Sequence, residues 1–217
     1  MKVIIPAKRN SSRVQDKNWR PFYKDKNLVQ IKIEQLLTKV LPVDIYLSCD
    51  DEEMKKYAAQ YGINFILRAP ALASDNTPWS DAVKGMVEEM PVNNDEDIAW
   101  VEVINPLFSD FDLLFEKWNQ VKAQYDSLVL VSPVTKFLLH NNGAPVNFMP
   151  GKWHAMSQNL DPLYAWDSVC IMSKKNILYF SYPIGKTPYL FSTESPCIDI
   201  DTLNEFELAQ LLFAQKI

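Results

Sequence analysis

The chain has 217 residues, of which 47% are hydrophobic and 23% charged, as is ordinary for one globular domain. Its net charge of −5 argues against a general nucleic-acid binder, because phosphate backbones favour positive surfaces. No apolar run approaches the roughly 18 residues of a membrane span, and the three cysteines have neither metal-binding nor disulfide-like spacing. We therefore expect a cytoplasmic protein that binds neither nucleic acid nor membrane.

Strand-like and helix-like segments alternate along the chain. Strands are expected at 3–5, 44–51, 64–68, 98–104, 127–134, 168–173 and 186–193. Helices are expected at 27–41, 51–62 and 110–124, and within 73–90 and 199–216. In the segment 73–90, Asp75 or Thr77 is the expected N-cap. This alternation predicts an α/β fold with a mostly parallel sheet between layers of helices.

The segment 136–166 interrupts the alternation. It contains three prolines, two glycines and several aromatic residues, and it shows neither helical nor strand periodicity. We expect it to project from the sheet as a loop or hairpin. The whole chain, 1–217, is then expected to form one domain with this excursion.

A strongly polar loop follows the first strand. Its basic residues are Lys8, Arg9, Arg13 and Lys17, and they are interspersed with Asn10, Ser11, Ser12 and Asn18. A loop between a strand and a helix places basic side chains at the carboxyl edge of the sheet, where phosphates commonly bind. Residues 1–61 contain no glycine, so neither a P-loop nor a dinucleotide-binding motif fits. The loop indicates an anion site, with a solvated charged loop as the alternative.

Two aspartates near the C-terminus suggest a metal site. If "IDID" is a strand, Asp199 and Asp201 lie on one face, about 7 Å apart. Two such carboxylates repel each other unless a cation lies between them, and Mg²⁺ prefers oxygen ligands. The alternative is that this segment only caps the last helix, since Thr202 and Glu205 have the spacing of a capping box.

Several motifs together resemble one family. They are "IIPAKRNSSRVQDKN", "SCDD", "ILRAPALASDNTP", "VINPL" and "IDIDTLNEFELAQLL", in this order. The sequence is similar to the cytidylyltransferases that activate acidic eight- and nine-carbon sugars, such as acylneuraminate cytidylyltransferase and the enzymes for legionaminate, pseudaminate and Kdo-type sugars. The resemblance implies the fold of nucleotide-diphospho-sugar transferases and a role in surface polysaccharide synthesis. It also implies that the projecting segment mediates homodimer formation.

The resemblance also implies roles for individual residues. The positions expected to bind CTP are Lys8, Asn10, Ser11, Arg13, Lys17, Asn18, Arg68 and Thr77. Asp199 and Asp201 match the pair that binds Mg²⁺, and together with Lys8 and Lys17 they are the expected catalytic residues. The positions expected to hold the sugar acid are Glu102, Asn105, Lys136, Gln158 and Asp167.

The sequence departs from the family pattern at several of these positions. Lys8 replaces an arginine, Ser12 a lysine, Asn10 a glycine and Asp167 an asparagine, and "VINPLF" lacks the glutamine and arginine of "QPTSPLR". A lysine cannot reproduce the two-pronged hydrogen bonding of an arginine. Two alternatives therefore stay open. One is a homologue that binds nucleotide or nucleotide-sugar without turnover, and the other is a nucleotidyltransferase for a different sugar acceptor.

Overall fold

A single mixed sheet organises the fold. The computed structural model describes residues 1–152, 154–160 and 163–216. The strands are β1 (Lys2–Pro6), β2 (Ile45–Cys49), β3 (Asn64–Leu67), β4 (Asp97–Val101), β5 (Ser127–Pro133), β6 (Tyr164–Ser173) and β7 (Pro188–Phe191). Their order is β3-β2-β1-β4-β6-β5-β7, and β6 runs antiparallel to both of its neighbours while the other pairs are parallel.

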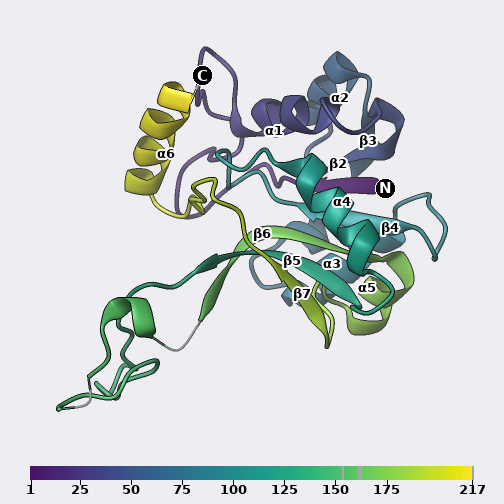
Figure 1. Cartoon of the computed structure of the whole chain (residues 1–217). Coiled ribbons are helices and arrows are strands. Elements are labelled where there is room, and N and C mark those ends of the chain that lie inside the picture. The colour runs from purple at the N-terminus through teal and green to yellow at the C-terminus, as the bar shows by residue number, and fades with distance from the viewer. Residues whose placement is uncertain (153, 161–162, 217) are drawn as a thin grey trace.

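Helices cover both faces of this sheet (Figure 1). They are α1 (Leu28–Leu37), α2 (Lys55–Tyr61), α3 (Trp79–Glu88), α4 (Phe111–Val121), α5 (Lys174–Phe180) and α6 (Leu203–Lys216). Apolar side chains of α1, α2, α4 and α6 form one hydrophobic core, and those of α3 and α5 form the other. The predicted three-layer α/β/α architecture is thereby confirmed. Helix α5 was missed, and no described helix is both long and apolar enough to cross a bilayer.

Three local expectations need correction. Helix α1 begins at a capping box formed by Asn27 and Gln30, which was not predicted, and it ends at Leu37 and not at residue 41. The N-cap of α3 is Pro78, with no side-chain cap, because Asp75 instead pairs with Lys8 and the Thr77 hydroxyl donates to the Ala71 carbonyl. The tertiary partners of the two expected caps therefore override the local capping preference.

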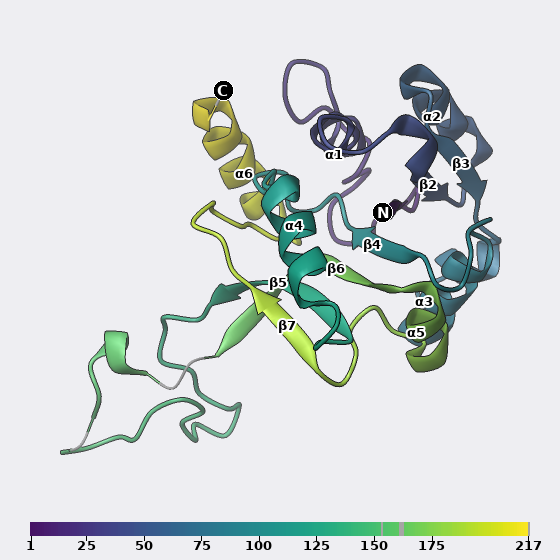
Figure 2. The same cartoon turned by 45° about the vertical axis from the view of Figure 1, so that its right-hand side comes forward.

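The segment between β5 and β6 projects from the sheet (Figures 1 and 2). It is shorter than expected, because Tyr164 already pairs with Pro133 as the start of β6. Within it, the Phe137 ring stacks on His154 with centroids 4.6 Å apart and meets Phe148 edge to face at 5.1 Å. The projection therefore has a small aromatic cluster of its own.

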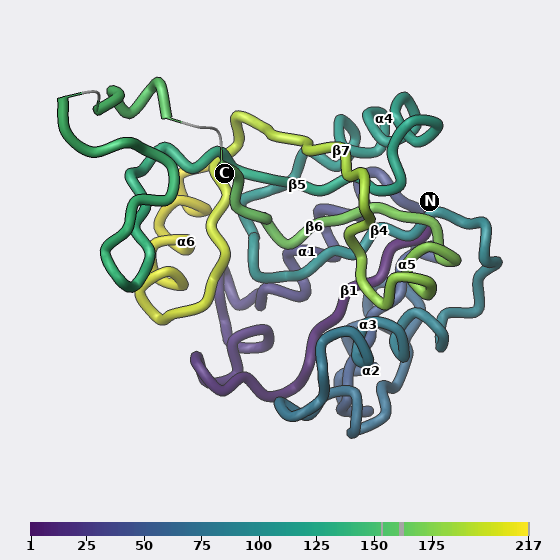
Figure 3. Tube along the Cα trace, turned by 90° about the horizontal axis from the view of Figure 1, so that it is seen from below, coloured from purple at the N-terminus to yellow at the C-terminus, as the bar shows by residue number. Residues whose placement is uncertain are grey.

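The loop after β1 packs against α6, the last helix of the chain (Figures 1 and 3). The Phe22 ring packs edge to face against Phe206 at 5.2 Å and Phe213 at 5.6 Å, both on α6. Gln210 of α6 also donates to the Phe22 carbonyl at 2.8 Å. This packing holds the loop after β1 against the segment that enters α6.

Lys32 of α1 is fully buried and has no carboxylate partner among the described residues. Its ammonium group donates to the carbonyls of Asn105 at 2.8 Å and Phe108 at 3.0 Å, and it lies 5.2 Å from the Phe111 ring centroid. Burial lowers the pKa of Lys32 to about 7. The lysine thus fixes the loop that follows β4, at the cost of desolvating its own charge.

We expect the free energy of unfolding to rise between pH 7 and pH 10 through Lys32. The pKa is about 7 in the folded state and 10.5 in the unfolded state, so the unfolded state binds the extra proton in this range. The rise is at most about 5 kcal/mol, since one pKa unit corresponds to about 1.4 kcal/mol. Urea denaturation of the wild type and of Lys32→Met at several pH values measures it. Parallel pH profiles of the two proteins would show that Lys32 stays charged in the fold.

Candidate active site

The basic loop lines a cavity of about 270 Å³ at the carboxyl ends of β1 and β4. Predicted site residues that line this cavity are Lys8, Ser11, Arg13, Lys17, Asn18, Arg68, Glu102 and Asp201. They come from four separate parts of the chain, since Arg68 follows β3, Glu102 follows β4 and Asp201 precedes α6. The fold therefore gathers residues that lie up to 193 positions apart in sequence into one polar cavity.

Two compartments of similar size adjoin this cavity, and both share Lys8 and Asp75 with it. One, of about 310 Å³, includes Asn10, and the other, of about 270 Å³, includes Thr77. A larger cavity of about 550 Å³ lies between α4 and the segment 191–195, but it contains none of the predicted site residues. The concentration of basic side chains, and not cavity size, therefore identifies the candidate site.

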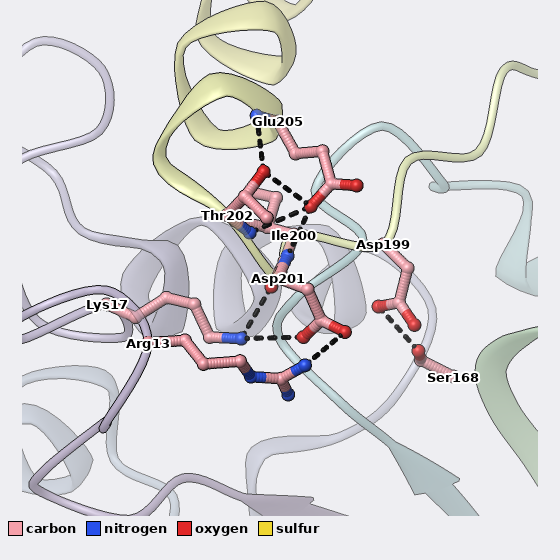
Figure 4. A network of polar contacts seen from close by, with 8 residues as sticks. All are labelled: Arg13, Lys17, Ser168, Asp199, Ile200, Asp201, Thr202 and Glu205. Atoms are coloured by element: carbon pink, nitrogen blue, oxygen red, sulfur yellow. Dashed lines mark hydrogen bonds and ion pairs between the residues drawn. The ribbon is translucent and has the colours of Figure 1, made fainter.

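Ion pairs join the loop after β1 to the segment that enters α6 (Figure 4). They link Asp201 to Arg13 and Lys17. The ammonium group of Lys17 donates to the Ile200 carbonyl and lies 3.4 Å from Asp201 Oδ1. Arg13 Nη1 lies 2.7 Å from the other oxygen, Asp201 Oδ2. Burial lowers the pKa of Lys17, and the nearby Arg13 lowers it further, whereas Asp201 opposes both effects. Asp201 thus lies against the positive side chains of the loop after β1, whereas Asp199 bonds to Ser168 and contacts neither cation directly.

The segment with the two aspartates is not a regular strand, which corrects the basis of the prediction. Ile200 is nevertheless buried, and its amide donates to the Ile104 carbonyl at 2.9 Å, so Asp199 and Asp201 extend to the same side of it (Figure 4). Thr202 and Glu205 form the predicted capping box: Glu205 Oε2 accepts from the Thr202 amide at 2.8 Å. The helix cap and the same-side arrangement of Asp199 and Asp201 were offered as alternatives, and this segment contains both.

The two carboxylates provide a donor set that suits Mg²⁺. Asp199 accepts from the Ser168 hydroxyl at 2.9 Å, and Asp201 bonds to the two cations. Removal of water by the surrounding protein raises the pKa of Asp199, and the negative charge of Asp201 raises it further. Among the described residues no third His, Cys, Asp or Glu completes a metal cage. Mg²⁺ commonly binds one or two carboxylates together with water and substrate phosphates, so the chemistry of this pair fits the ion.

Asn18 and Arg68 form the more buried walls of the cavity. Asn18 Nδ2 and the Trp19 indole both donate to the Lys8 carbonyl at 3.1 Å, whereas Asn18 Oδ1 is buried without a partner among the described residues. Arg68 donates to the Ser48 carbonyl at 2.9 Å, and burial lowers the pKa of its guanidinium. A buried acceptor without a donor is costly, so Asn18 Oδ1 is a strained feature of this wall.

Ser168 was not predicted as a site residue. It lies in an irregular part of the β5–β6 pairing and has a left-handed backbone, with φ of 62°, which is uncommon outside glycine. Its hydroxyl donates to Asp199 and its carbonyl accepts from the Glu102 amide at 3.0 Å. Nothing in the local sequence signals this irregularity, because it depends on how two distant strands pair.

Four of the five predicted sugar-binding residues do not line the cavity. Asn105 is fully buried, and its Oδ1 accepts from the Phe108 amide at 3.4 Å, a contact that shapes the loop after β4. Asp167 is buried in β6 and accepts from the Ser132 hydroxyl at 2.6 Å. Lys136 and Gln158 are exposed on the projecting segment. Of this group, only Glu102 lies at the cavity within this chain.

Known proteins resemble this chain over most of its length. Residues 2–147 match the family model described as cytidylyltransferase. The pseudaminic acid cytidylyltransferase of Campylobacter jejuni (strain 81-176) is 26% identical over 230 residues, which cover 97% of this chain and 94% of that protein. The N-acylneuraminate cytidylyltransferase of Streptococcus agalactiae (strain 2603 V/R) is 23% identical over 212 residues, or 94% of this chain. The chain spans about half the length of that second relative, 51%.

Solved structures show the same fold at low sequence identity. CMP:2-keto-3-deoxy-manno-octonic acid synthetase, complexed with CTP, superposes with a TM-score of 0.70 at 15% identity, covering 100% of this chain and 99% of that one. A 4-diphosphocytidyl-2C-methyl-D-erythritol synthase also gives 0.70, at 10% identity and 97% coverage of both chains. With the match over residues 2–147, the chain belongs to the cytidylyltransferase family of nucleotidyltransferases.

Proposed function

We propose that this enzyme transfers CMP from CTP to a 2-keto sugar acid and releases pyrophosphate. The observation that supports the proposal most directly is the meeting of Lys8, Arg13 and Lys17 with Asp201 in one cavity. Relatives that cover nearly the whole chain are named for pseudaminic acid and N-acylneuraminate. In the reaction, the anomeric hydroxyl oxygen attacks the α-phosphorus, and the bond to the bridging oxygen of the β-phosphate breaks.

The basic residues supply the electrostatic part of the catalysis. Nucleotidyl transfer depends mainly on positioning and on neutralising charge at the phosphate oxygens. Lys8, Arg13 and Lys17 would bind the triphosphate, with Ser11 and Asn10 as hydrogen-bond donors beside it. The remaining assigned residues, Asn18, Arg68 and Thr77, would contact the nucleoside. Asp201 and Asp75 pair with these cations, and the paired cations line the cavity.

Asp199 and Asp201 would hold Mg²⁺ at the phosphates. When bound there, the ion supplies positive charge that offsets the negative charge of the triphosphate. Ser168 orients Asp199 through its 2.9 Å hydrogen bond, and Lys17 and Arg13 orient Asp201. These contacts position both carboxylates before the ion arrives.

The projecting segment supports a homodimeric arrangement within the same proposal. Its exposed apolar residues include Leu139, Met149 and Met156. Lys136 and Gln158 lie on this segment, outside the cavity of their own chain. If two chains associate through the projection, these two residues would reach the acceptor in the partner's site.

We also propose that residues 1–217 act as one cytoplasmic catalytic unit whose product serves surface polysaccharide synthesis.

Pyrophosphate release from CTP and Mg²⁺, measured with a panel of 2-keto sugar acids and mass detection of CMP-sugars, tests the proposal. We expect turnover with at least one nine- or eight-carbon acid and none without Mg²⁺. CTP-induced thermal stabilisation without any turnover would instead identify a nucleotide-binding homologue. Turnover restricted to sugar phosphates or other acceptors would identify a nucleotidyltransferase of different specificity.

A further inference from the structure

Glu102 differs from the other acids around the cavity in having no cation or hydroxyl partner among the described residues. Asp201 bonds to Arg13 and Lys17, and Asp75 pairs with Lys8. Asp199 and Asp167, which do not line the cavity, accept hydrogen bonds from serine hydroxyls. Among the described residues, the Glu102 carboxylate therefore accepts a hydrogen bond from the Trp100 indole and from no cation or hydroxyl.

The position of Glu102 is fixed while one of its oxygens stays accessible. Its backbone amide donates to the Ser168 carbonyl at 3.0 Å, and Oε1 accepts from the Trp100 indole at 3.1 Å. Oε2 has no partner among the described residues, yet it is not one of the buried side-chain oxygens. It is therefore accessible, and the cavity that Glu102 lines leads to it. A firmly held carboxylate with one open oxygen is well suited to accept a proton.

We infer that Glu102 is the general base of the transfer reaction, with Oε2 as the atom that receives the proton of the attacking sugar hydroxyl. This inference rests on the proposed function. As the hydroxyl oxygen forms its bond to the α-phosphorus, its proton passes to Glu102, and pyrophosphate leaves with the electron pair of the broken P–O bond. One O–P bond forms, one O–P bond breaks and one proton moves to Glu102, so the step needs no further reactant.

The electrostatic surroundings of Glu102 agree with this role. Burial raises the pKa of Glu102 to about 7, and Asp199 and Asp201 raise it, while the Trp100 hydrogen bond and Lys17 lower it. Cys170 of β6 and Tyr182 after α5 also interact electrostatically with this carboxylate. A base with a pKa near the working pH is deprotonated often enough to act and still basic enough to take a proton.

Glu102→Gln tests the inference, because glutamine keeps an oxygen for Trp100 but cannot accept the proton. We expect kcat to fall roughly 100- to 10,000-fold with CTP binding unchanged. The wild-type rate should be half-maximal near pH 7, the pKa of Glu102, and level off roughly one to two pH units higher, and the variant should lose that rise. Glu88→Gln, an exposed substitution on α3, is the matched control and should keep the wild-type profile.

The outcomes separate this inference from the proposed function. Wild-type turnover that persists in Glu102→Gln with the same pH profile overturns the role of Glu102 alone. A loss of kcat without a change in pH profile assigns Glu102 to acceptor positioning and also overturns the inference. If the wild type turns over no sugar acid at all, the proposed function fails, and the assignment of the base fails with it.

Discussion

Asp201→Asn is expected to reduce CTP turnover roughly 100- to 1,000-fold while leaving the fold intact. The amide cannot replace a carboxylate that bonds to Arg13 through one oxygen and approaches Lys17 with the other. The substitution would also replace one of the two proposed carboxylate ligands of Mg²⁺ with a neutral amide oxygen, which binds this ion less well. Pyrophosphate release at saturating CTP measures the change.

The fold should tolerate this substitution because the capping contact of Asp201 uses its backbone amide, which donates to Glu205 at 2.9 Å. Thermal unfolding of the variant should therefore stay close to that of the wild type. Asp95→Asn provides the control, since Asp95 is an exposed acid whose 2.8 Å contact with Lys175 lies away from the cavity. Wild-type turnover in Asp201→Asn would refute the assignment of this carboxylate to the catalytic site.

Lys17→Met is expected to weaken CTP binding by roughly 10- to 100-fold. A hydrogen bond to a charged group contributes about 1.5–3 kcal/mol, and the ammonium group of Lys17 is buried at the cavity wall. Methionine fills a similar volume but carries no charge and no donor. The bond to the Ile200 carbonyl would be lost as well, so the segment entering α6 would be held less firmly against the loop after β1.

Calorimetric titration with CTP in the presence of Mg²⁺ measures this effect, and the KM for the sugar should change little. Lys39→Met is the matched control, because Lys39 pairs with Asp112 at 3.0 Å on the surface, outside the cavity. An effect of Lys17→Met on the sugar KM alone would reassign the loop after β1 to the acceptor.

The sequence indicated that the basic loop and the C-terminal aspartates matter, but it did not indicate the structure around them. The basic loop was recognised because four cations and five neutral polar residues within 8–18 are visible without any structure. The reason for the pairing of the aspartates was wrong, since the segment is not a strand, although the buried Ile200 still separates them. Ser168 could not be found, because its left-handed backbone arises from the irregular pairing of β5 with β6.

Local features were determined by the sequence alone: the alternation of strands and helices, the capping boxes at Asn27 and Thr202, and the chemistry of the loop after β1. Each depends on residues within a few positions of one another. Only the tertiary structure decided which charges meet and which are desolvated. Lys17 reaches Ile200 across 183 positions, and Lys32 and Glu102 owe their shifted pKa values to burial by distant segments. Desolvation and charge pairing depend on distance in space, which spacing along the chain does not specify.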